Sequence, residues 1–284
     1  MRWEGRDESG NIEDRRGAGG GGMRMGLPVG GGIGGVVLLL LYSALTGQNP
    51  LDLISSSGGD SGYSEPGPAA PPANDPQTRF MRVVLKDTED TWTTIFRNNG
   101  SRYEVPTLVL FSGATDTACG LGESAMGPFY CPGDRKVYLD TSFFEELHSR
   151  FGAPGDFAQA YVIAHEIGHH VQNVLGLSER VRELQQRRPD QANQLSVLLE
   201  LQADCFAGIW AHSTEQRDIL ERGDVEEGIG AAAAVGDDRI QKQGGARVNP
   251  ETSTHGSSQQ RVQWFQRGMQ KGSVADCNTF ADAG

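Results

Sequence analysis

The apolar positions of the chain divide it into four segments. Residues 1–26 are polar and show no apolar periodicity, so we expect a disordered tail. Residues 27–46, LPVGGGIGGVVLLLLYSALT, form an uncharged run that is long enough, at about 1.5 Å per residue, to span a bilayer core. Residues 47–77 are rich in Pro, Gly and Ser, which predicts a tether. Residues 78–284 are numerous enough to form one domain with its own core.

The run at 27–46 predicts one uncleaved transmembrane helix. A buried core helix is an alternative, but the glycines within the run would weaken a water-soluble helix, and the run has no polar face. A cleaved signal peptide would have a shorter and less acidic leader. Five Arg precede the run, and the next basic residue after it is Arg79. This distribution predicts a cytoplasmic N-terminus, with everything after residue 46 outside the cytoplasm.

A helical period appears between Gly155 and Gly176. Asp156 can cap the first turn with Gln159 three residues later, and Gly176 is a natural stop. Apolar residues then recur at a 4-3-4-3-4 spacing, which predicts one helix with a continuous buried stripe. The stripe consists of Phe157, Tyr161, Ala164, Gly168, Val171 and Leu175.

Residues 164–172 read AHEIGHHVQ and place His165 and His169 beside that stripe. Positions i and i+4 project side by side from a helix, so these two imidazoles can bind one metal ion. Zinc suits nitrogen ligands and tolerates three protein ligands with an open fourth position. Glu166 points about 100° away and can reach a water at that position as a general base. The alternative, a solvated polar helix face, is disfavoured by the apolar stripe.

A second helix, predicted over residues 190–213, offers the third ligand. Glu200 and Asp204 lie at i, i+4 on a face that also carries small residues. Gly168 is the matching small residue on the histidine helix, so we expect the helices to cross there and to bring Glu200 to the metal. Asp204 would then accept the far N–H of a ligand histidine. The alternative for both is a solvated helix carboxylate.

Further elements complete an α+β fold that is predominantly helical, with a small sheet, preceded by one transmembrane helix. Phe129-Tyr130 and Val137–Leu139 flank a Pro-Gly-Asp turn, which predicts a hairpin. Three more helices are predicted, at residues 178–188, 224–240 and 257–269.

Charge excludes one class of partner. The chain has 25 basic and 37 acidic residues, for a formal net charge of −12. Nucleic-acid binding needs a basic surface, so we expect no nucleic-acid partner. The segment before the apolar run is charge-balanced, so the acidic excess lies in the tether and the domain. An acidic domain should be soluble and should not lie flat on anionic lipid.

The four cysteines are Cys119, Cys131, Cys205 and Cys277. An even number in an oxidising compartment suggests two disulfides, for which three pairings exist. We favour Cys119–Cys131, which closes a short loop, and Cys205–Cys277, which would pin the C-terminal tail to a core helix. A zinc ribbon is the rival interpretation, but the sequence contains no C-x-x-C.

The remaining histidines offer one further catalytic candidate. His255 lies in a polar Thr-His-Gly-Ser loop before a predicted helix, and it could donate a hydrogen bond to the oxyanion of an attacked carbonyl. Tyr161 is the second choice for that donor, although its place on the apolar stripe favours packing. His170 lies off the i, i+4 face and is expected to be structural. His148 and His212 are expected to be ordinary helix residues.

Together these motifs resemble the HExxH…ExxxD arrangement of gluzincin peptidases. The segments that resemble the bacterial putative neutral zinc metallopeptidase family are MRWEGR…NIEDRR, CGLGESAMGPFYCPGDRKVYLD, HEIGHHVQ, ELQADCFAG and THGSSQQRVQWFQRG. The resemblance implies a zincin-like domain in which His165, His169 and Glu200 bind Zn²⁺. It also implies that Glu166 is the base, that Asp204 supports a ligand histidine and that an edge strand lies beside the cleft. Ser124–Gly127 is the candidate edge strand, with a purely structural hairpin as the alternative. With the anchor, it places the protein in the bacterial inner membrane, with an extracytoplasmic catalytic domain.

The predicted function is hydrolysis of peptide bonds in a peptide or protein substrate by a zinc-dependent metalloendopeptidase. Glu166 would take a proton from water and deliver it to the leaving amine. Two alternatives remain open: another zinc hydrolase such as an amidase, and a non-catalytic metal-bearing binding module. Glu166 argues against the binding module, because such a module has no need for a base at that position.

Overall fold

The computed structural model describes residues 1–17, 75–243 and 254–281. Residues 1–16 belong to the same compact unit as the chain from residue 71 onward. The strands are β1 (Ile12–Asp14), β2 (Thr107–Phe111), β3 (Ala114–Thr117), β4 (Gly120–Glu123), β5 (Phe129–Cys131) and β6 (Lys136–Asp140). The longer helices are α3 (Pro76–Asn98), α4 (Ser142–Ser149), α5 (Asp156–Val174), α6 (Leu177–Arg187), α7 (Ala192–Gln216), α8 (Asp224–Ala234), α9 (Asp237–Gln243) and α10 (Ser258–Lys271). Short 3-10 helices are η2 (Ser124–Met126), η3 (Pro189–Gln191) and η5 (Val274–Cys277).

The main sheet has the strand order β1-β2-β6-β5. β1, β2 and β6 are parallel, and β5 is antiparallel to β6 at one edge. The predicted hairpin is confirmed, because β5 and β6 pair with Phe129 opposite Tyr138 and Cys131 opposite Lys136. The centre of the sheet is buried, which suits the apolar run Leu108–Phe111 in β2. β3 and β4 form a separate two-stranded ribbon.

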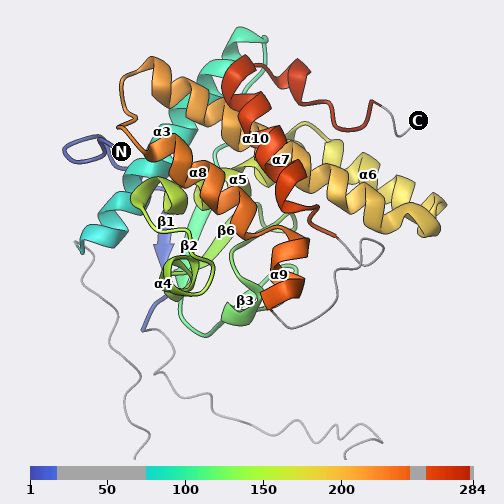
Figure 1. The fold of residues 1–284 in the computed structure, drawn as a ribbon, viewed down its shortest axis with the longest axis horizontal. Helices are drawn as coiled ribbons and strands as arrows, with labels where there is room; N and C mark the ends of the chain where they lie inside the picture. Colours follow the sequence, from blue (N-terminus) through green and yellow to red (C-terminus); the bar gives the residue numbers. More distant parts are fainter. Residues whose placement is uncertain (18–74, 244–253, 282–284) are drawn as a thin grey trace, which may run out of the picture. The chain divides into compact units, whose positions relative to one another are not determined.

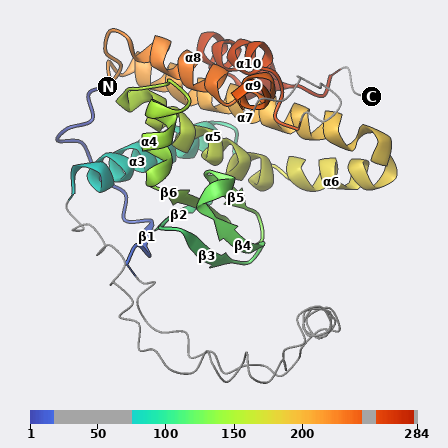
Figure 2. The same ribbon diagram turned by 60° about the horizontal axis from the view of Figure 1, so that its bottom comes forward.

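Helices pack over one side of this sheet, with α5 next to it (Figures 1 and 2). α5 contacts β5 and β6, and it also contacts α3, α7 and α8. α7 in turn packs along α10. The position of α5 between strands and helices explains why fourteen of its nineteen residues are buried. Side chains on this helix therefore reach both the core and the cleft described below.

The predicted helices α5, α6, α7 and α10 are confirmed to within three residues at each end. Ser257 caps α10 through a capping box with Gln260. The helix predicted over 224–240 is instead broken into α8 and α9 around Gly236. A Cβ at Gly236 would lie 2.4 Å from the backbone nitrogen of Ser258, so the backbone at the start of α10 packs directly against Gly236.

Glycines set two close helix crossings. A Cβ on Gly168 of α5 would lie 2.9 Å from the backbone oxygen of Ala203 in α7, which confirms the crossing expected at Gly168. A Cβ on Gly208 of α7 would lie 2.1 Å from the backbone oxygen of Phe265, and one on Gly268 of α10 would lie 1.9 Å from that of Cys205. Because backbone atoms are in contact at both crossings, the distances of α7 from α5 and from α10 are fixed.

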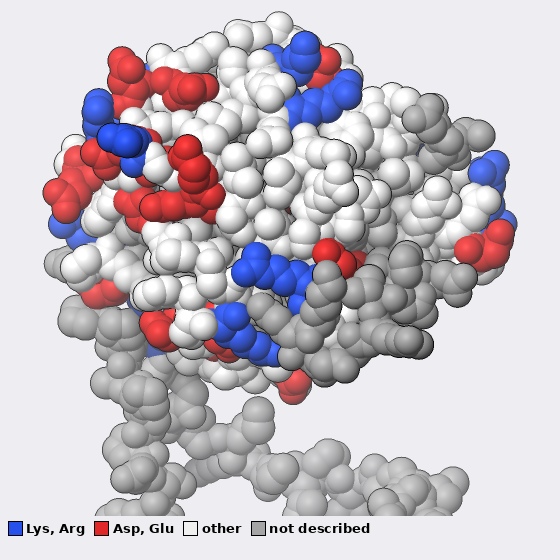
Figure 3. Space-filling model, viewed as in Figure 1, with Lys and Arg blue, Asp and Glu red and all other residues white. Residues whose placement is uncertain are grey.

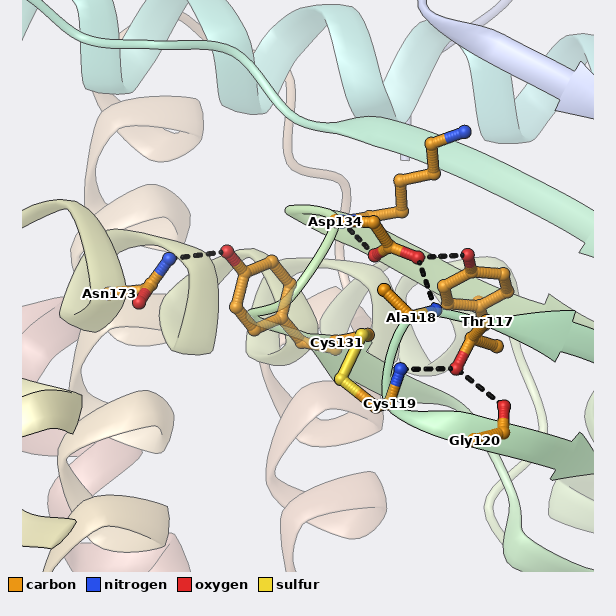
Figure 4. Close-up of a disulfide and its surroundings, with 10 residues drawn as sticks. Thr117, Ala118, Cys119, Gly120, Cys131, Asp134 and Asn173 are labelled. Atoms are coloured by element: carbon orange, nitrogen blue, oxygen red, sulfur yellow. Dashed lines mark hydrogen bonds between the residues drawn. A yellow bond between two sulfur atoms is a disulfide. The ribbon is translucent and has the colours of Figure 1, made fainter.

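The favoured disulfide pairing is confirmed: Cys119 is bonded to Cys131 and Cys205 to Cys277. The first bond ties the turn of the β3–β4 ribbon to the edge strand β5 (Figure 4). Asp134 accepts hydrogen bonds from the backbone of Ala118 and from Tyr138, which holds the same turn against β6. The second bond ties η5, near the C-terminus, to α7.

The membrane-anchored architecture predicted from the sequence is corrected by this fold. In the ranges 1–17, 75–243 and 254–281, no helix is both long and apolar enough to cross a bilayer, and the predicted span at 27–46 lies outside the described residues. Residues 1–16 are not a separate cytoplasmic tail, since β1 pairs with β2 in the main sheet. A single crossing after residue 16 would leave β1 and β2 on opposite sides of a membrane. The predicted inner-membrane, single-pass localisation with an extracytoplasmic domain is therefore wrong as well.

The N-terminal segment is held by ion pairs as well as by the sheet. The ammonium group of Met1 contacts Asp156 at 2.8 Å and Asp224 at 3.2 Å. Burial lowers the pKa of this amino group, but the two carboxylates raise it by more. Acidic side chains gather around this end of the chain on the face drawn in Figure 3. At the end of the segment, Arg16 donates hydrogen bonds to Asp14 and to Thr78, at 2.6 Å each.

Candidate metal centre

A cleft of about 620 Å³ runs beside α5. From α5 it is lined by residues at helical spacing: Tyr161, Val162, His165, Glu166, His169 and Gln172. One wall is formed by η2, β5 and α4, and the other by α7, the segment between α8 and α9, and the loop before α10. One edge of α5, which carries His165 and His169 beside the apolar stripe, therefore faces the cleft.

His165, His169 and Glu200 converge at the floor of this cleft. Nε2 of His165 lies 3.2 Å from Oε2 of Glu200, and Nε2 of His169 lies 3.4 Å from Oε1 of the same carboxylate. One ligand atom from each of the three residues lies within 4.8 Å of the other two. The i, i+4 spacing brings the imidazoles together, and the crossing at Gly168 brings Glu200 from α7.

This donor set fits zinc. Ligand atoms about 2.0–2.1 Å from a tetrahedral ion lie about 3.3 Å from one another, and one ligand atom from each of the three residues already lies within 4.8 Å of the other two. Three carboxylates, Glu166, Glu200 and Asp204, face one guanidinium, Arg261, so the site carries a net charge of −2 before histidine protonation. A buried excess of negative charge is unfavourable unless positive charge balances it. Either a divalent cation or two imidazolium groups would balance it.

Asp204 of α7 lies behind His165. Its Oδ1 is 2.9 Å from Nδ1 of His165, and it also accepts hydrogen bonds from Tyr161 and from Arg261, whose Nε is 2.8 Å from Oδ2. Burial by itself raises the pKa of Asp204, but Arg261 and His165 together hold it below its usual range. An ionised Asp204 leaves the proton of His165 on Nδ1, so that Nε2 faces Glu200.

The electrostatics of the metal-free chain favour protonated imidazoles. Burial lowers the pKa of His165, yet Asp204 and Glu200 raise it to about 9. The pKa of His169 is also raised, by Glu200 against the effect of burial. The two histidines in turn hold the pKa of Glu200 well below its usual range, although burial opposes this. A bound cation must displace these protons, so metal affinity should rise with pH.

Glu166 faces the cleft one residue after His165. It is 8% exposed and lines the same cavity as the three ligand residues. Burial raises its pKa, with the two histidines acting in the opposite direction. A raised pKa makes the carboxylate a stronger base, which favours the uptake of a proton from water, as a general base requires.

His255 reaches the cleft from the loop before α10. Its Nδ1 lies 3.1 Å from Oδ1 of Asp237, and Oδ2 of Asp237 accepts the backbone N–H groups of Thr254, His255 and Gly256. The bond to Asp237 raises the pKa of His255. The protonated ring is therefore favoured, and it has a second N–H that can donate into the cleft. The exposed fraction of this side chain is 51%, so solvent also reaches it.

Comparison with known proteins fits this geometry. The family model described as "Putative neutral zinc metallopeptidase" matches residues 1–280. The chain belongs to this family. YpfJ of Escherichia coli K12 is 49% identical over 285 residues, which covers 99% of each chain. Mb2605 of Mycobacterium bovis is 44% identical over 216 residues, which covers 72% of each. No solved structure gives a significant match.

Three side chains of the site could not be placed there from the sequence of this family member. Arg261 is buried at the same period as Phe265 and Met269 on α10, so an arginine on an apolar stripe was the available signal. Asp237 lies within the helix predicted over 224–240, and only the fold shows that it holds the loop of His255. Gln172, seven residues after His165, lies on the cleft edge of α5.

The predicted edge strand at Ser124–Gly127 is wrong. Residues 124–126 form η2 instead, although they do line the cleft. Gly127 has φ of 75°, which ends any extended path there. The edge strand of the main sheet that borders the cleft is β5, since Phe129 and Tyr130 on it line the cleft.

His170 has a structural place in the metallopeptidase fold, as expected. It is fully buried, its Nε2 lies 2.6 Å from the backbone oxygen of Glu104, and its Nδ1 lies 3.1 Å from the hydroxyl of Tyr130. The same hydroxyl accepts a hydrogen bond from Asn173 (Figure 4). Burial lowers the pKa of His170 to about 4, so the ring is neutral and ties α5 to β5.

Proposed function

We propose that the chain is a zinc-dependent metallopeptidase whose metal ligands are His165, His169 and Glu200. The convergence of these three side chains on one point beside Glu166 is the observation that carries the proposal. Membership of a zinc metallopeptidase family supports it. When bound, zinc supplies a Lewis acid at this point and lowers the pKa of a coordinated water toward ~7.

Glu166 acts as the proton carrier of the proposed reaction. It takes a proton from the attacking water as the oxygen bonds to the carbonyl carbon of the scissile peptide. It then delivers that proton to the amine nitrogen as the carbon–nitrogen bond breaks. Its burial and its place on the cleft edge of α5 support this role.

The protonated His255 donates a hydrogen bond to the oxygen that gains negative charge during attack. A preorganised donor of this kind contributes most when it is fixed before substrate binds. Asp237 fixes it here through the imidazole and three backbone N–H groups. Tyr161 is less suited to donate to substrate, because its hydroxyl is bonded to Asp204.

The substrate that this cleft suits is an extended polypeptide. β5 lies at the edge of the sheet and pairs only with β6 within the described part of the chain, so its other side can accept a peptide as an added strand. The cleft runs past the metal centre along α5, which suits cleavage within a chain.

The test is hydrolysis of a panel of unfolded proteins by the zinc-loaded chain and its Glu166→Gln variant. We expect the variant to bind zinc with unchanged stoichiometry while kcat falls by about 10²- to 10⁴-fold, because a positioned acid–base group contributes that much. Glu183→Gln, an exposed glutamate on α6, is the matched control and should leave kcat unchanged.

Equal rates for the parent chain and Glu166→Gln would disprove the catalytic role of this residue. Cell-wall amides tested beside the proteins separate a peptidase from an amidase. Hydrolysis of the amides alone would show that the reaction class is right and the substrate class is wrong.

A further inference from the structure

A buried chain of side-chain amides leads away from His169. Nδ1 of His169 lies 3.0 Å from Oε1 of Gln172. Nε2 of Gln172 donates to the backbone oxygen of Leu199 at 2.7 Å and to Oε1 of Gln202 at 3.2 Å. Nε2 of Gln202 donates to the backbone oxygen of Cys277 at 2.9 Å. Gln172 and Gln202 are both buried, so water does not compete for these bonds.

The direction of this chain is fixed at its far end. Backbone oxygens only accept hydrogen bonds, so the backbone oxygen of Cys277 must be bonded by the NH₂ group of Gln202. The side-chain oxygen of Gln202 is then left facing Gln172. That oxygen and the backbone oxygen of Leu199 then both require the NH₂ group of Gln172. The oxygen of Gln172 is left facing His169, where it accepts only from an imidazole that is protonated on Nδ1.

The Cys205–Cys277 disulfide holds the terminal acceptor in place. Cys277 ends η5 and is fully buried, and its bond to Cys205 attaches it to α7, the helix that also carries Glu200 and Gln202. Thr279 adds a second tie, since its hydroxyl donates to the backbone oxygen of Leu198 at 2.7 Å. The C-terminal segment therefore completes the hydrogen bonding behind one ligand of the metal centre.

We propose that Gln172 is a positioning residue for His169, and that Gln202 and the disulfide-bound C-terminal segment, together with the backbone oxygen of Leu199, set the orientation of the Gln172 amide. The inference rests on the proposed zinc site. The Nδ1–H form of His169 leaves the lone pair of Nε2 free for a metal ion, whereas the other tautomer places a proton there. The two histidines are thus supported by different chemistry: a carboxylate for His165 and a neutral, oriented amide for His169.

Two substitutions at Gln172 separate positioning from packing. Gln172→Met removes both the acceptor that faces His169 and the donors that face α7. Gln172→Glu removes the donors but keeps an acceptor. A purely structural role predicts the same zinc affinity for both variants, because both lose the bonds to α7. The positioning role predicts that Gln172→Met binds zinc about 10- to 100-fold more weakly than the parent chain, and that Gln172→Glu binds far more tightly than Gln172→Met.

Gln202→Met tests whether the orientation is inherited from the C-terminal segment. In the parent background it should weaken zinc binding, because the amide of Gln172 then loses one of the two acceptors that orient it, and the backbone oxygen of Leu199 remains. In the Gln172→Glu background it should have no effect, because the two oxygens of a carboxylate are equivalent acceptors. This double-mutant comparison cancels the charge that the glutamate adds. Gln185→Met is the matched control, since Gln185 bonds Ala192 and Ser196 between α6 and α7 without contacting a ligand.

The measurement is zinc affinity by chelator competition on the full chain at fixed pH, with urea unfolding of each metal-free variant alongside. Lower metal-free stability with unchanged zinc affinity in Gln172→Met would overturn the inference and leave the zinc site intact. So would a Gln202→Met effect of equal size in both backgrounds. Failure of the parent chain to bind zinc at one equivalent would instead overturn the proposed function, and this inference with it.

Discussion

One carboxylate, Asp237, organises the loop that carries the proposed oxyanion donor. The bond to Asp237 is the largest influence on the pKa of His255 and raises it, with burial acting in the opposite direction. His255 donates from its protonated form, which exists below its pKa and is lost as the pH rises through it. Activity should therefore fall on the alkaline side, where His255 loses its proton.

Asp237→Asn should move that alkaline limb to lower pH. The asparagine can keep the neutral hydrogen bonds to the loop but cannot stabilise an imidazolium to the same degree. The measurement is the pH profile of kcat/KM on a peptide substrate. Asp238→Asn is the control, because Asp238 accepts from Ser258 at the start of α10 rather than from His255. An alkaline limb that stays in place in Asp237→Asn would show that His255 is not the titrating group.

Single residues of the site differ in how far the sequence reveals them. His165, Glu166 and His169 lie on one turn of one helix, so helical geometry alone brings them together. Glu200 could be placed because small residues on two predicted helices indicated where they cross. Arg261 could not, because its salt bridge to Asp204 spans 57 residues and depends on how α10 packs against α7. The same holds for Gln172, whose role depends on the side chain of Gln202.

At the scale of elements, the crossing of α5 and α7 sets the spacing of the metal ligands. A Cβ on Gly168 would lie 2.9 Å from the oxygen and 3.0 Å from the Cα of Ala203, and neither backbone atom can move without moving α7. Gly168→Ala should therefore force the helices apart. We expect a loss of about 1–3 kcal/mol in the free energy of unfolding, even though alanine favours a helix. Zinc affinity should fall as well, because Glu200 moves away from the imidazoles.

Gly230→Ala is the matched control for this prediction. Gly230 lies inside α8, and nothing lies within 4 Å of a Cβ built there. The same substitution should stabilise the protein there by up to about 1 kcal/mol. Urea unfolding and zinc titration of both variants provide the measurement. Equal stability changes at the two positions would contradict the close crossing.

Helices were easier to predict than the strands that flank the cleft. α5, α7 and α10 each carry an apolar period that predicts a helix. Ser257 caps α10 as a local signal, whereas α5 and α7 begin without a side-chain cap. η2 and β5 are three residues each, too short for alternation to distinguish strand from turn. β1 is equally short and pairs with a strand that begins almost a hundred residues later. Its partner, rather than its own sequence, makes it a strand.

At the scale of the whole molecule, an apolar run at 27–46 led to the wrong architecture. That run was interpreted from its own composition, which says nothing about whether the chain before it joins the fold after it. The described residues answer that question, since Met1 lies in the main core and β1 extends the main sheet. The N-terminal ammonium also pairs with Asp156 at the first turn of α5, so this segment contacts the helix that carries the metal ligands.

Residues 1–16 should accordingly stabilise the folded unit that carries the proposed metal centre. Removing them takes away β1, the buried Met1 side chain and the ion pairs to Asp156 and Asp224. Burial of the methionine alone contributes about 1.5–3 kcal/mol. From this contribution alone, a chain that starts at residue 75 should unfold about 3–12 °C below the full chain, because one kcal/mol corresponds to roughly 2–4 °C at this size.

The contrasting variant keeps residues 1–17 and replaces 18–74 with a short linker. Arg16 lies 3.6 Å from Asp75 and donates to Thr78, so the two ends that the linker must join lie close together. Eight Gly and Ser residues have a mean span of about 16 Å, which is enough to join these ends. We expect this variant to keep the thermal midpoint and zinc stoichiometry of the full chain. If the linker variant unfolded early while the chain from residue 75 stayed stable, β1 would not belong to the catalytic unit, and the separation of tail from domain that the sequence suggested would be restored.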